Sequence, residues 1–343
     1  MSDAQQAGAQ GAPDPSVIFE TLNAHQRSAA LRGAIELDLF TAIGEGNRTA
    51  AAIASRCQAS ERGIRVICDF LTVHGFVTKQ DGEYGLPPVS AAFLDKKSPA
   101  YMGSIAQFIN SPDLLRAFGD IAETVRRGRT LLDGHGSVEP NWHGWVTFAK
   151  SMAPMMGPAS DFIGKLAADG ANGHLRTLDI AAGHGLFGIG VARHNPKAQI
   201  VALDWPRVLE VAQGNAQAAG VAERYSLLPG SAFEVEYGNN FDLILATNFF
   251  HHFDVPMCES LMRKMGAALN PGGRVITLEF VPNDDRVSPP ISATFSMMML
   301  GTTAAGDAYT FAEYDQMFRN AGFTQNELHQ PEKSPQQVIV SYR

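Results

Sequence analysis

The sequence is poor in cysteine, with only three among 343 residues. Cys57, Cys68 and Cys258 are an odd number and show no C-x-x-C spacing, so they indicate neither a disulfide framework nor a structural zinc site. Thiols without such organisation are typical of a reducing compartment, and we expect a cytoplasmic protein.

Long apolar runs and an excess of positive charge are also missing. No stretch approaches the ~18 residues that a membrane span requires, and no Lys or Arg precedes Arg27, so we expect neither a membrane segment nor a signal peptide. The 27 Lys and Arg residues against 35 Asp and Glu give a net charge of -8. This balance offers no general attraction to nucleic acid or to an anionic membrane, and it favours small molecules or proteins as partners.

With 343 residues and 45% hydrophobic content, the chain is long enough for two domains with separate cores. We expect a disordered tail over residues 1–16, a first domain over 17–101, a helical connector over 102–170 and a second domain over 171–343. The tail is rich in Ala, Gln, Gly and Pro and shows no apolar periodicity, so it receives no function.

The first domain has the pattern of a winged helix-turn-helix. Apolar residues at helical spacing predict one helix from Leu31 to Ile43, and Thr49 and Ser60 are placed to cap two further helices. A hairpin with Asp-Gly at its turn follows over 77–85. The motif can read DNA, but nine basic residues against eleven acidic ones over 1–100 lack the expected electrostatic footprint. The apolar face of the predicted helix instead indicates a homodimer surface.

From residue 175 onward, short apolar runs alternate with helical stretches, which is typical of a parallel sheet covered by helices on both faces. The first run leads into DIAAGHG, a glycine-rich turn at which the backbone can approach a ligand closely. Asp204 ends the second run, 25 residues after Asp179, where a carboxylate can accept hydrogen bonds from both hydroxyls of a ribose. The pattern therefore predicts a nucleoside site. The predicted strands cover 178–181, 200–203, 241–246, 274–279 and 337–342.

The turn DIAAGHG followed by ALDWP resembles the first two motifs of class I, Rossmann-like, S-adenosylmethionine-dependent methyltransferases. Nearly the whole chain is similar to the O-methyltransferase family that includes plant caffeic acid enzymes and bacterial hydroxyneurosporene and polyketide-tailoring enzymes. The resemblance implies an α/β Rossmann-like domain with a mostly parallel seven-stranded sheet, preceded by an α-helical winged-helix dimerisation domain. It implies S-adenosylmethionine as the cofactor and an aromatic or polyketide-like acceptor from secondary metabolism. The cofactor-binding residues that it implies are Ala181, Gly183, Gly185, Asp204, Trp205, Ser231, Ala232, Phe233 and Thr247.

The segment 248–254, which follows the predicted strand 241–246, stands where residues of an open α/β sheet face the ligand crevice. It resembles the family's His-Asp-Trp element, and this alignment implies that His251, rather than His252, is the catalytic base. An ordinary imidazole, with a pKa of ~6.5, is largely neutral at pH 7 and can accept the proton of a hydroxyl. Glu279 ends the neighbouring strand, where a carboxylate can hold the imidazole tautomer and favour its protonated form. No carboxylate cluster stands beside His251, so we expect no metal.

Two methionine-rich stretches stand at helical spacing, a pattern that is more often core than pocket, and the family resemblance makes them candidates for the acceptor pocket. The resemblance implies that Phe148 and Met152 lie beside the reacting methyl group, and flexible thioethers suit the walls around a flat, apolar acceptor. The full set of predicted pocket residues is Phe148, Met152, Met155, Met156, Phe295, Met298 and Met299.

The chain departs from the family pattern at three places. Ser231-Ala232 replaces an Asp-Met pair, Thr247 replaces a lysine, and Ala308 replaces a second glutamate. These departures leave open a relative that binds the cofactor but acts as a hydroxylase or a pericyclic catalyst. A third interpretation, a winged-helix regulator with a cofactor-sensing domain, is disfavoured by the charge of the first hundred residues.

Overall fold

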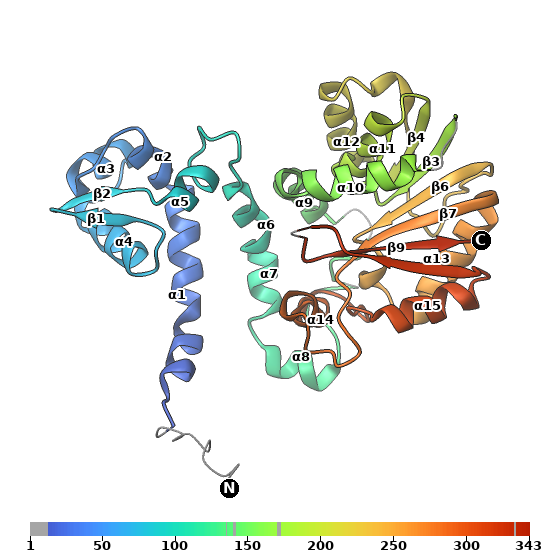
Figure 1. The fold of residues 1–343 in the computed structure, drawn as a ribbon. Coiled ribbons are helices and arrows are strands. Elements are labelled where there is room, and N and C mark those ends of the chain that lie inside the picture. The colour runs from blue at the N-terminus through green and yellow to red at the C-terminus, as the bar shows by residue number, and fades with distance from the viewer. Residues whose placement is uncertain (1–12, 135, 140–141, 170–172, 333) are drawn as a thin grey trace, which may run out of the picture. The chain divides into compact units, whose positions relative to one another are not determined.

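The computed structural model describes residues 13–343, apart from 135, 140–141, 170–172 and 333 (Figure 1). It divides into two compact units, residues 1–106 and 107–343. Most of the predicted tail, residues 1–12, lies outside the described residues.

The N-terminal unit is mainly helical and contains one hairpin. Thr49 and Ser60 cap their helices as predicted, since their hydroxyls accept hydrogen bonds from Ala52 N and Gly63 N. Asp81 and Gly82 both have positive φ, which matches the two-residue turn expected between the hairpin strands. The elements are α1 (Ser16–Glu36), α2 (Leu39–Gly44), α3 (Ala50–Cys57), α4 (Glu61–Val73), β1 (Thr78–Gln80), β2 (Glu83–Gly85), α5 (Pro88–Phe93) and a 3-10 turn (Gly103–Ile105).

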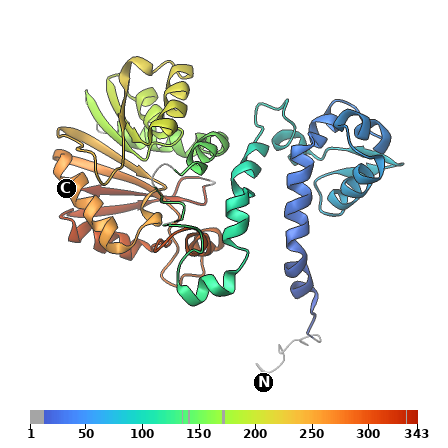
Figure 2. The ribbon, with the colours of Figure 1, turned by 180° about the vertical axis from the view of Figure 1, so that it is seen from behind.

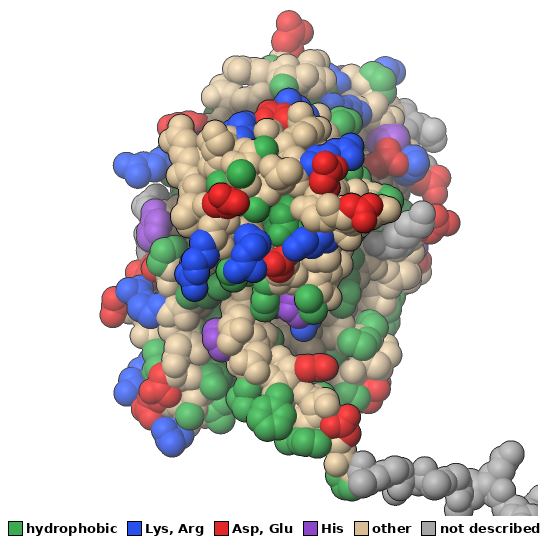
Figure 3. Space-filling model, turned by 90° about the vertical axis from the view of Figure 1, so that its left-hand side faces the viewer, with side chains coloured by type: hydrophobic (Ala, Val, Ile, Leu, Met, Phe, Trp, Pro, Cys, Tyr) green, Lys and Arg blue, Asp and Glu red, His purple; other side chains and the backbone are tan. Residues whose placement is uncertain are grey.

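The prediction of one helix from Leu31 to Ile43 was wrong. The chain leaves helical geometry after Glu36, Asp38 adopts a left-handed conformation with φ 57°, and α2 then begins at Leu39. The change of direction places Leu39 and Ile43 in the core of the N-terminal unit, at 0% and 5% exposure. These two residues are therefore not part of a dimer surface, contrary to what the predicted helix face suggested. The large apolar residues that α1 exposes lie in its first two turns, at Val17, Ile18, Phe19 and Leu22. On the face shown in Figure 3, lysine and arginine side chains are interspersed with aspartate and glutamate.

The C-terminal unit begins with short helices and then alternates strands with helices. Its helices are α6 (Ala106–Ile109), α7 (Pro112–Ala117), α8 (Ile121–Arg127), α9 (Gly144–Met152), α10 (Gly157–Ala168), α11 (Leu186–His194), α12 (Pro206–Ala218), α13 (Val255–Ala268), α14 (Pro290–Thr302) and α15 (Phe311–Asn320), with 3-10 turns at Ala153–Met155, Ala222–Arg224 and Phe250–His252. Its strands are β3 (Leu175–Ile180), β4 (Ala198–Asp204), β5 (Tyr225–Pro229), β6 (Phe241–Thr247), β7 (Leu269–Glu279), β8 (Gln325–His329) and β9 (Gln337–Tyr342).

The seven strands form one sheet in the order β5-β4-β3-β6-β7-β9-β8, in which β9 pairs antiparallel with β7 and β8 and the other neighbouring strands pair parallel. Figures 1 and 2 show helices covering both faces. Alternate residues of β6 explain this arrangement: Ile244 and Ala246 belong to a core with α13 and α15, while Leu243 and Leu245 belong to a core with α10 and α11. A strand buried on both faces reads as a continuous apolar run, which is why β6 was predicted.

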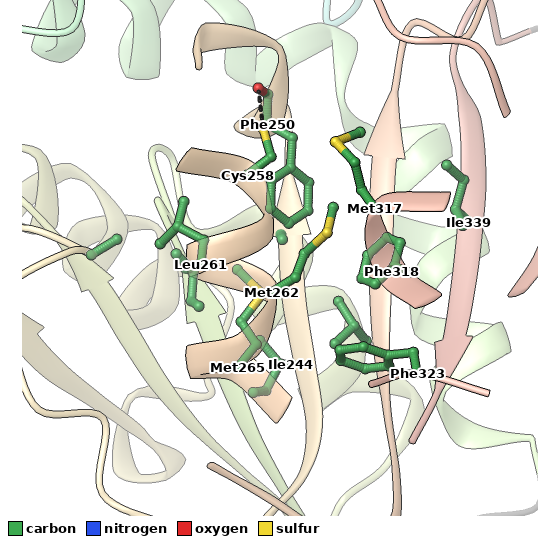
Figure 4. Close-up of a cluster of buried hydrophobic side chains, with 14 of the residues drawn as sticks. Ile244, Phe250, Cys258, Leu261, Met262, Met265, Met317, Phe318, Phe323 and Ile339 are labelled. Carbon is green, nitrogen blue, oxygen red and sulfur yellow. Dashed lines mark hydrogen bonds between the residues drawn. The ribbon is translucent and has the colours of Figure 1, made fainter. Parts of the chain in front are cut away.

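The core beneath β6 and β7 also anchors the turn that follows β6 (Figure 4). The Cys258 thiol on α13 lies 3.3 Å from the carbonyl oxygen of Phe250, to which it donates a hydrogen bond. Phe250 itself is fully buried and packs against Phe318 of α15 at a ring-centroid distance of 6.0 Å. His251 and His252 therefore follow a firmly held residue.

Candidate active site

A cavity of about 640 Å³ lies at the carboxyl ends of β3, β4, β5 and β6, within the ~300–1,000 Å³ typical of small-molecule sites. The segments after these strands form one wall, and residues from α9 and from the loop after α14 form another. The described lining residues are Val138, Trp145, Phe148, Ala181, Ala182, Gly183, His184, Phe187, Leu203, Asp204, Trp205, Val208, Gly230, Ser231, Ala232, Phe233, Glu234, Thr247, Asn248, Phe249, His252, Phe253, Asp254, Met257, Ala304 and Ala305.

The glycine-rich turn after β3 is shaped by three residues with positive φ, Ala181, Gly183 and Gly185. Gly183 lines the cavity, and its backbone N–H donates to Asp204 Oδ2 at 2.8 Å. Gly185 does not line the cavity; a Cβ there would lie 2.7 Å from the Tyr225 hydroxyl, so this glycine allows α11 to begin close to β5. In this turn, Gly183 therefore lines the cavity, whereas Gly185 permits the close start of α11 beside β5.

Asp204 stands at the end of β4, and the backbone fixes its carboxylate. Oδ2 accepts from Gly183 N, and Oδ1 accepts from Trp205 N at 2.7 Å. Burial raises the pKa of Asp204 to about 6, although these two N–H groups oppose the shift. Since an ionised carboxylate has about four lone-pair sites, each oxygen can accept a further hydrogen bond from a ligand.

Lys264 of α13 hydrogen-bonds to the loop that follows β5. The lysine Nζ donates to the carbonyl oxygens of Ala232 and Phe233, at 3.0 and 2.9 Å, and lies 4.3 Å from the centre of the Tyr237 ring. The Tyr237 hydroxyl donates to Ala232 O as well, at 2.5 Å. The loop that lines the cavity is therefore tied to the helix that follows the two histidines.

His251 and Glu279 meet at the ends of β6 and β7, as the adjacency of these strands predicts. The distance between His251 Nδ1 and Glu279 Oε2 is 2.5 Å, and Glu279 Oε1 accepts from the backbone N–H groups of Phe249 and Phe250 at 2.9 Å each. Glu279 is 0% and His251 is 4% exposed. Among the described residues, none hydrogen-bonds to His251 Nε2, so a carboxylate orients the ring while its other nitrogen stays available.

His252 lines the cavity, whereas His251 and Glu279 are not among its described lining residues. Its ring makes an edge contact with Trp145, with centroids 5.2 Å apart, and lies 4.2 Å from the ring of His251. Its Nδ1 is buried, and no described residue hydrogen-bonds to it. Burial, together with the proximity of His251, holds the pKa of His252 well below its usual value, so this imidazole is neutral at pH 7.

The predicted cofactor residues converge on the cavity, with the exception of Gly185. Of the predicted acceptor residues, Phe148 alone is among the described lining residues. Met156 and Met299 are buried in the protein interior, at 9% and 3% exposure, while Met155 is 41% exposed. Met152 packs against the core around α10 and α11, and Met298 is half-buried on α14.

Phe295 lies beside the base rather than in the cavity wall. Its ring meets His251 edge-on at 4.9 Å and stacks on Phe280 at 4.1 Å. The sequence interpretation missed other lining residues: His252, Trp145, Val138, Ala304 and Ala305. Val138 and Ala304 are next to residues that pair across two parts of the chain: Thr130 N donates to Thr303 O, and Ser137 N donates to Thr302 O.

Within the part of the chain that the structure describes, no group of three or more His, Cys, Asp or Glu side chains is arranged to hold a metal ion. Over the same residues, no helix has the length and apolar character needed to cross a membrane.

Comparison with known proteins identifies relatives over both units. Residues 166–324 match an O-methyltransferase domain, and residues 19–96 match an O-methyltransferase dimerisation domain. A crystal structure of a presumed O-methyltransferase from Nostoc punctiforme is 50% identical, with a TM-score of 0.94 over 96% of this chain and 100% of that one. The 3-hydroxy-5-methyl-1-naphthoate 3-O-methyltransferase of Streptomyces sahachiroi is 26% identical over 90% of this chain and 89% of its own. The fold is shared with human N-acetylserotonin methyltransferase in complex with S-adenosylmethionine, at a TM-score of 0.83 and 20% identity over 98% and 99% of the two chains.

Proposed function

The chain belongs to the O-methyltransferase family, whose members depend on S-adenosylmethionine, and from that premise we propose that it methylates a hydroxyl of an aromatic or polyketide-like small molecule with His251 as general base. When bound, S-adenosylmethionine supplies an electrophilic methyl group on a positively charged sulfur.

The cavity residues fit this cofactor. Asp204 keeps two lone-pair positions for the ribose hydroxyls, and Gly183 allows the backbone to approach the amino-acid end. Trp205 and Phe233 offer apolar surfaces for the nucleobase of the cofactor. The Ser231 hydroxyl accepts a hydrogen bond from Phe233 N and can still donate one to the nucleobase. Ala181, Ala232 and Thr247 complete this wall. The departures at Ser231, Ala232 and Thr247 change side chains but leave the backbone and Asp204, which carry most of the contacts.

The observation that carries the proposal is the contact between His251 Nδ1 and Glu279. The carboxylate keeps the proton of a neutral imidazole on Nδ1, so Nε2 carries the lone pair that can take the proton of an acceptor hydroxyl. As that proton arrives, the imidazolium forms next to a fully buried carboxylate, which stabilises its charge. Ala308 replaces the family's second glutamate and is fully buried, so Glu279 is the carboxylate that orients and stabilises the His251 ring.

The acceptor then lies against Phe148 and Trp145, which bound the cavity on the α9 side. The Phe295 ring packs edge-on against the base. We assign residues 17–101 to dimerisation, 102–170 to a connector that contributes to the acceptor pocket, and 171–343 to cofactor binding and catalysis. We also infer a homodimer, supported by the dimerisation-domain match and by the exposed apolar start of α1.

Incubation with S-adenosylmethionine and a panel of hydroxyaromatic compounds tests this function. Mass spectrometry is expected to detect S-adenosylhomocysteine together with a methyl ether, and neither without an acceptor. A hydroxylated or rearranged product without S-adenosylhomocysteine would overturn the proposal in favour of a catalyst that does not transfer methyl groups.

A further inference from the structure

The two neighbouring histidines differ in what fixes their nitrogen atoms. A neutral imidazole has one donor and one acceptor nitrogen, and the partner of one nitrogen sets the role of the other. Glu279 engages Nδ1 of His251 and so makes its Nε2 an acceptor. No described residue engages Nδ1 of His252, which is buried. Nε2 is therefore the ring nitrogen of His252 that can reach a ligand, and it can act there as donor or as acceptor.

The surroundings of His252 favour a flat partner. Its ring packs edge-on against Trp145, which in turn meets Phe148 at 5.6 Å, and both aromatic residues line the cavity. The centres of the His251 and His252 rings are 4.2 Å apart. The two rings are therefore in contact, so a polar group that His252 binds from the cavity lies close to the proposed base, although His251 itself is not among the described lining residues.

The charges of the cavity argue against an anionic partner. Its described lining residues include three carboxylic acids, Asp204, Glu234 and Asp254, and no lysine or arginine. A carboxylate on the acceptor would lose hydration without gaining an ion pair from a lysine or arginine of the described lining. Neither histidine adds a permanent positive charge, because His252 is neutral and His251 must be neutral to act as a base.

We propose that His252 selects the acceptor, which is an uncharged aromatic compound with a second hydrogen-bonding group, a hydroxyl or an amine, next to the hydroxyl that is methylated. This proposal rests on the proposed function and specifies its substrate class. His252 is a specificity residue, whereas His251 takes the proton.

Three naphthalene probes test the proposal: 2-naphthol, 2,3-dihydroxynaphthalene and 3-hydroxy-2-naphthoate. We expect kcat/KM for the dihydroxy compound, corrected for its two equivalent hydroxyls, to exceed that for 2-naphthol by about 5–10-fold, the effect of one neutral hydrogen bond. The naphthoate is expected to be the poorest of the three. Calorimetry on the protein loaded with S-adenosylhomocysteine should give the same order of affinity, independently of turnover.

Two variants make the test specific. His252→Phe keeps a ring against Trp145 but removes both nitrogens, and it should bring the two naphthols to within about 2-fold of each other. His252→Asn keeps a donor and an acceptor and should retain most of the preference. An unchanged preference in His252→Phe, or a wild-type preference for the naphthoate, would overturn the proposal. Absence of S-adenosylhomocysteine with every probe and with the wider hydroxyaromatic panel would contradict the proposed function instead.

Discussion

Replacing Asp204 by asparagine tests the cofactor site at the residue where geometry and charge agree. The two carboxylate oxygens accept from Gly183 N and Trp205 N and keep two lone-pair positions for ribose hydroxyls. A hydrogen bond to a charged group contributes about 1.5–3 kcal/mol, and an amide replaces one of the two acceptor oxygens by a donor. We therefore expect the Kd for S-adenosylmethionine to rise at least ~10-fold at pH 7.5, measured by calorimetry.

The pKa of Asp204 gives the same experiment a second readout. Because burial raises this pKa to about 6 and the cofactor needs the ionised carboxylate, wild-type affinity should fall as the pH drops through 6, by up to ~10-fold per unit. In Asp204→Asn that dependence should be much weaker. Glu210→Gln, an exposed carboxylate on α12, removes the same charge and should preserve both the affinity and its pH dependence. Unchanged affinity in a folded Asp204→Asn variant would refute the placement of the ribose.

Three further predictions follow from other contacts. Lys264→Met removes two hydrogen bonds to the carbonyls of the loop after β5, so the Kd for the cofactor should rise ~10-fold while kcat at saturation changes little; equal loss in kcat would contradict a positioning role. Burial raises the pKa of Asp179 to about 7, so the folded state holds a proton that the unfolded chain loses near pH 4, and stability should fall as pH rises from 4 to 7. Asp179→Asn should weaken that slope and stabilise the protein at pH 8 by up to about 4 kcal/mol, measured by urea unfolding, whereas an unaltered slope would show that Asp179 stays ionised. Light scattering should give twice the 36.9 kDa chain mass, and Phe19→Glu on the exposed start of α1 should reduce it; a wild-type monomer at all concentrations would exclude the dimer.

Strands buried on both faces could be predicted from the sequence, because their side chains are apolar at successive positions. The two strands that the apolar runs did not indicate, β5 and β8, stand at opposite edges of the sheet and are only partly buried. An edge strand carries a weaker apolar pattern, so periodicity gives little signal there. The break between α1 and α2 was not predicted, because the apolar spacing continues across Leu37 and Asp38 although the backbone turns there.

The site could be predicted where it depends on strand ends and not where it depends on loops. Asp204 and Glu279 follow from the strands that they terminate, and strand adjacency brings Glu279 to His251. A methionine at helical spacing fits a core as well as a pocket, and Met156 and Met299 lie in the interior. Trp145 and Ala304 line the cavity because of tertiary contacts that no local sequence pattern predicts.

The most direct test of the account is a single-turnover methyl-transfer assay with cofactor carrying a deuterated methyl group. In the wild type, the label should appear on an aromatic oxygen. In His251→Ala, the rate should fall by about 10²- to 10⁴-fold while the Kd for S-adenosylmethionine stays nearly unchanged, because a general base acts on the transition state and does not hold the nucleoside. A full rate in His251→Ala would contradict the account, and a full rate there combined with loss in His252→Ala would move the base to His252.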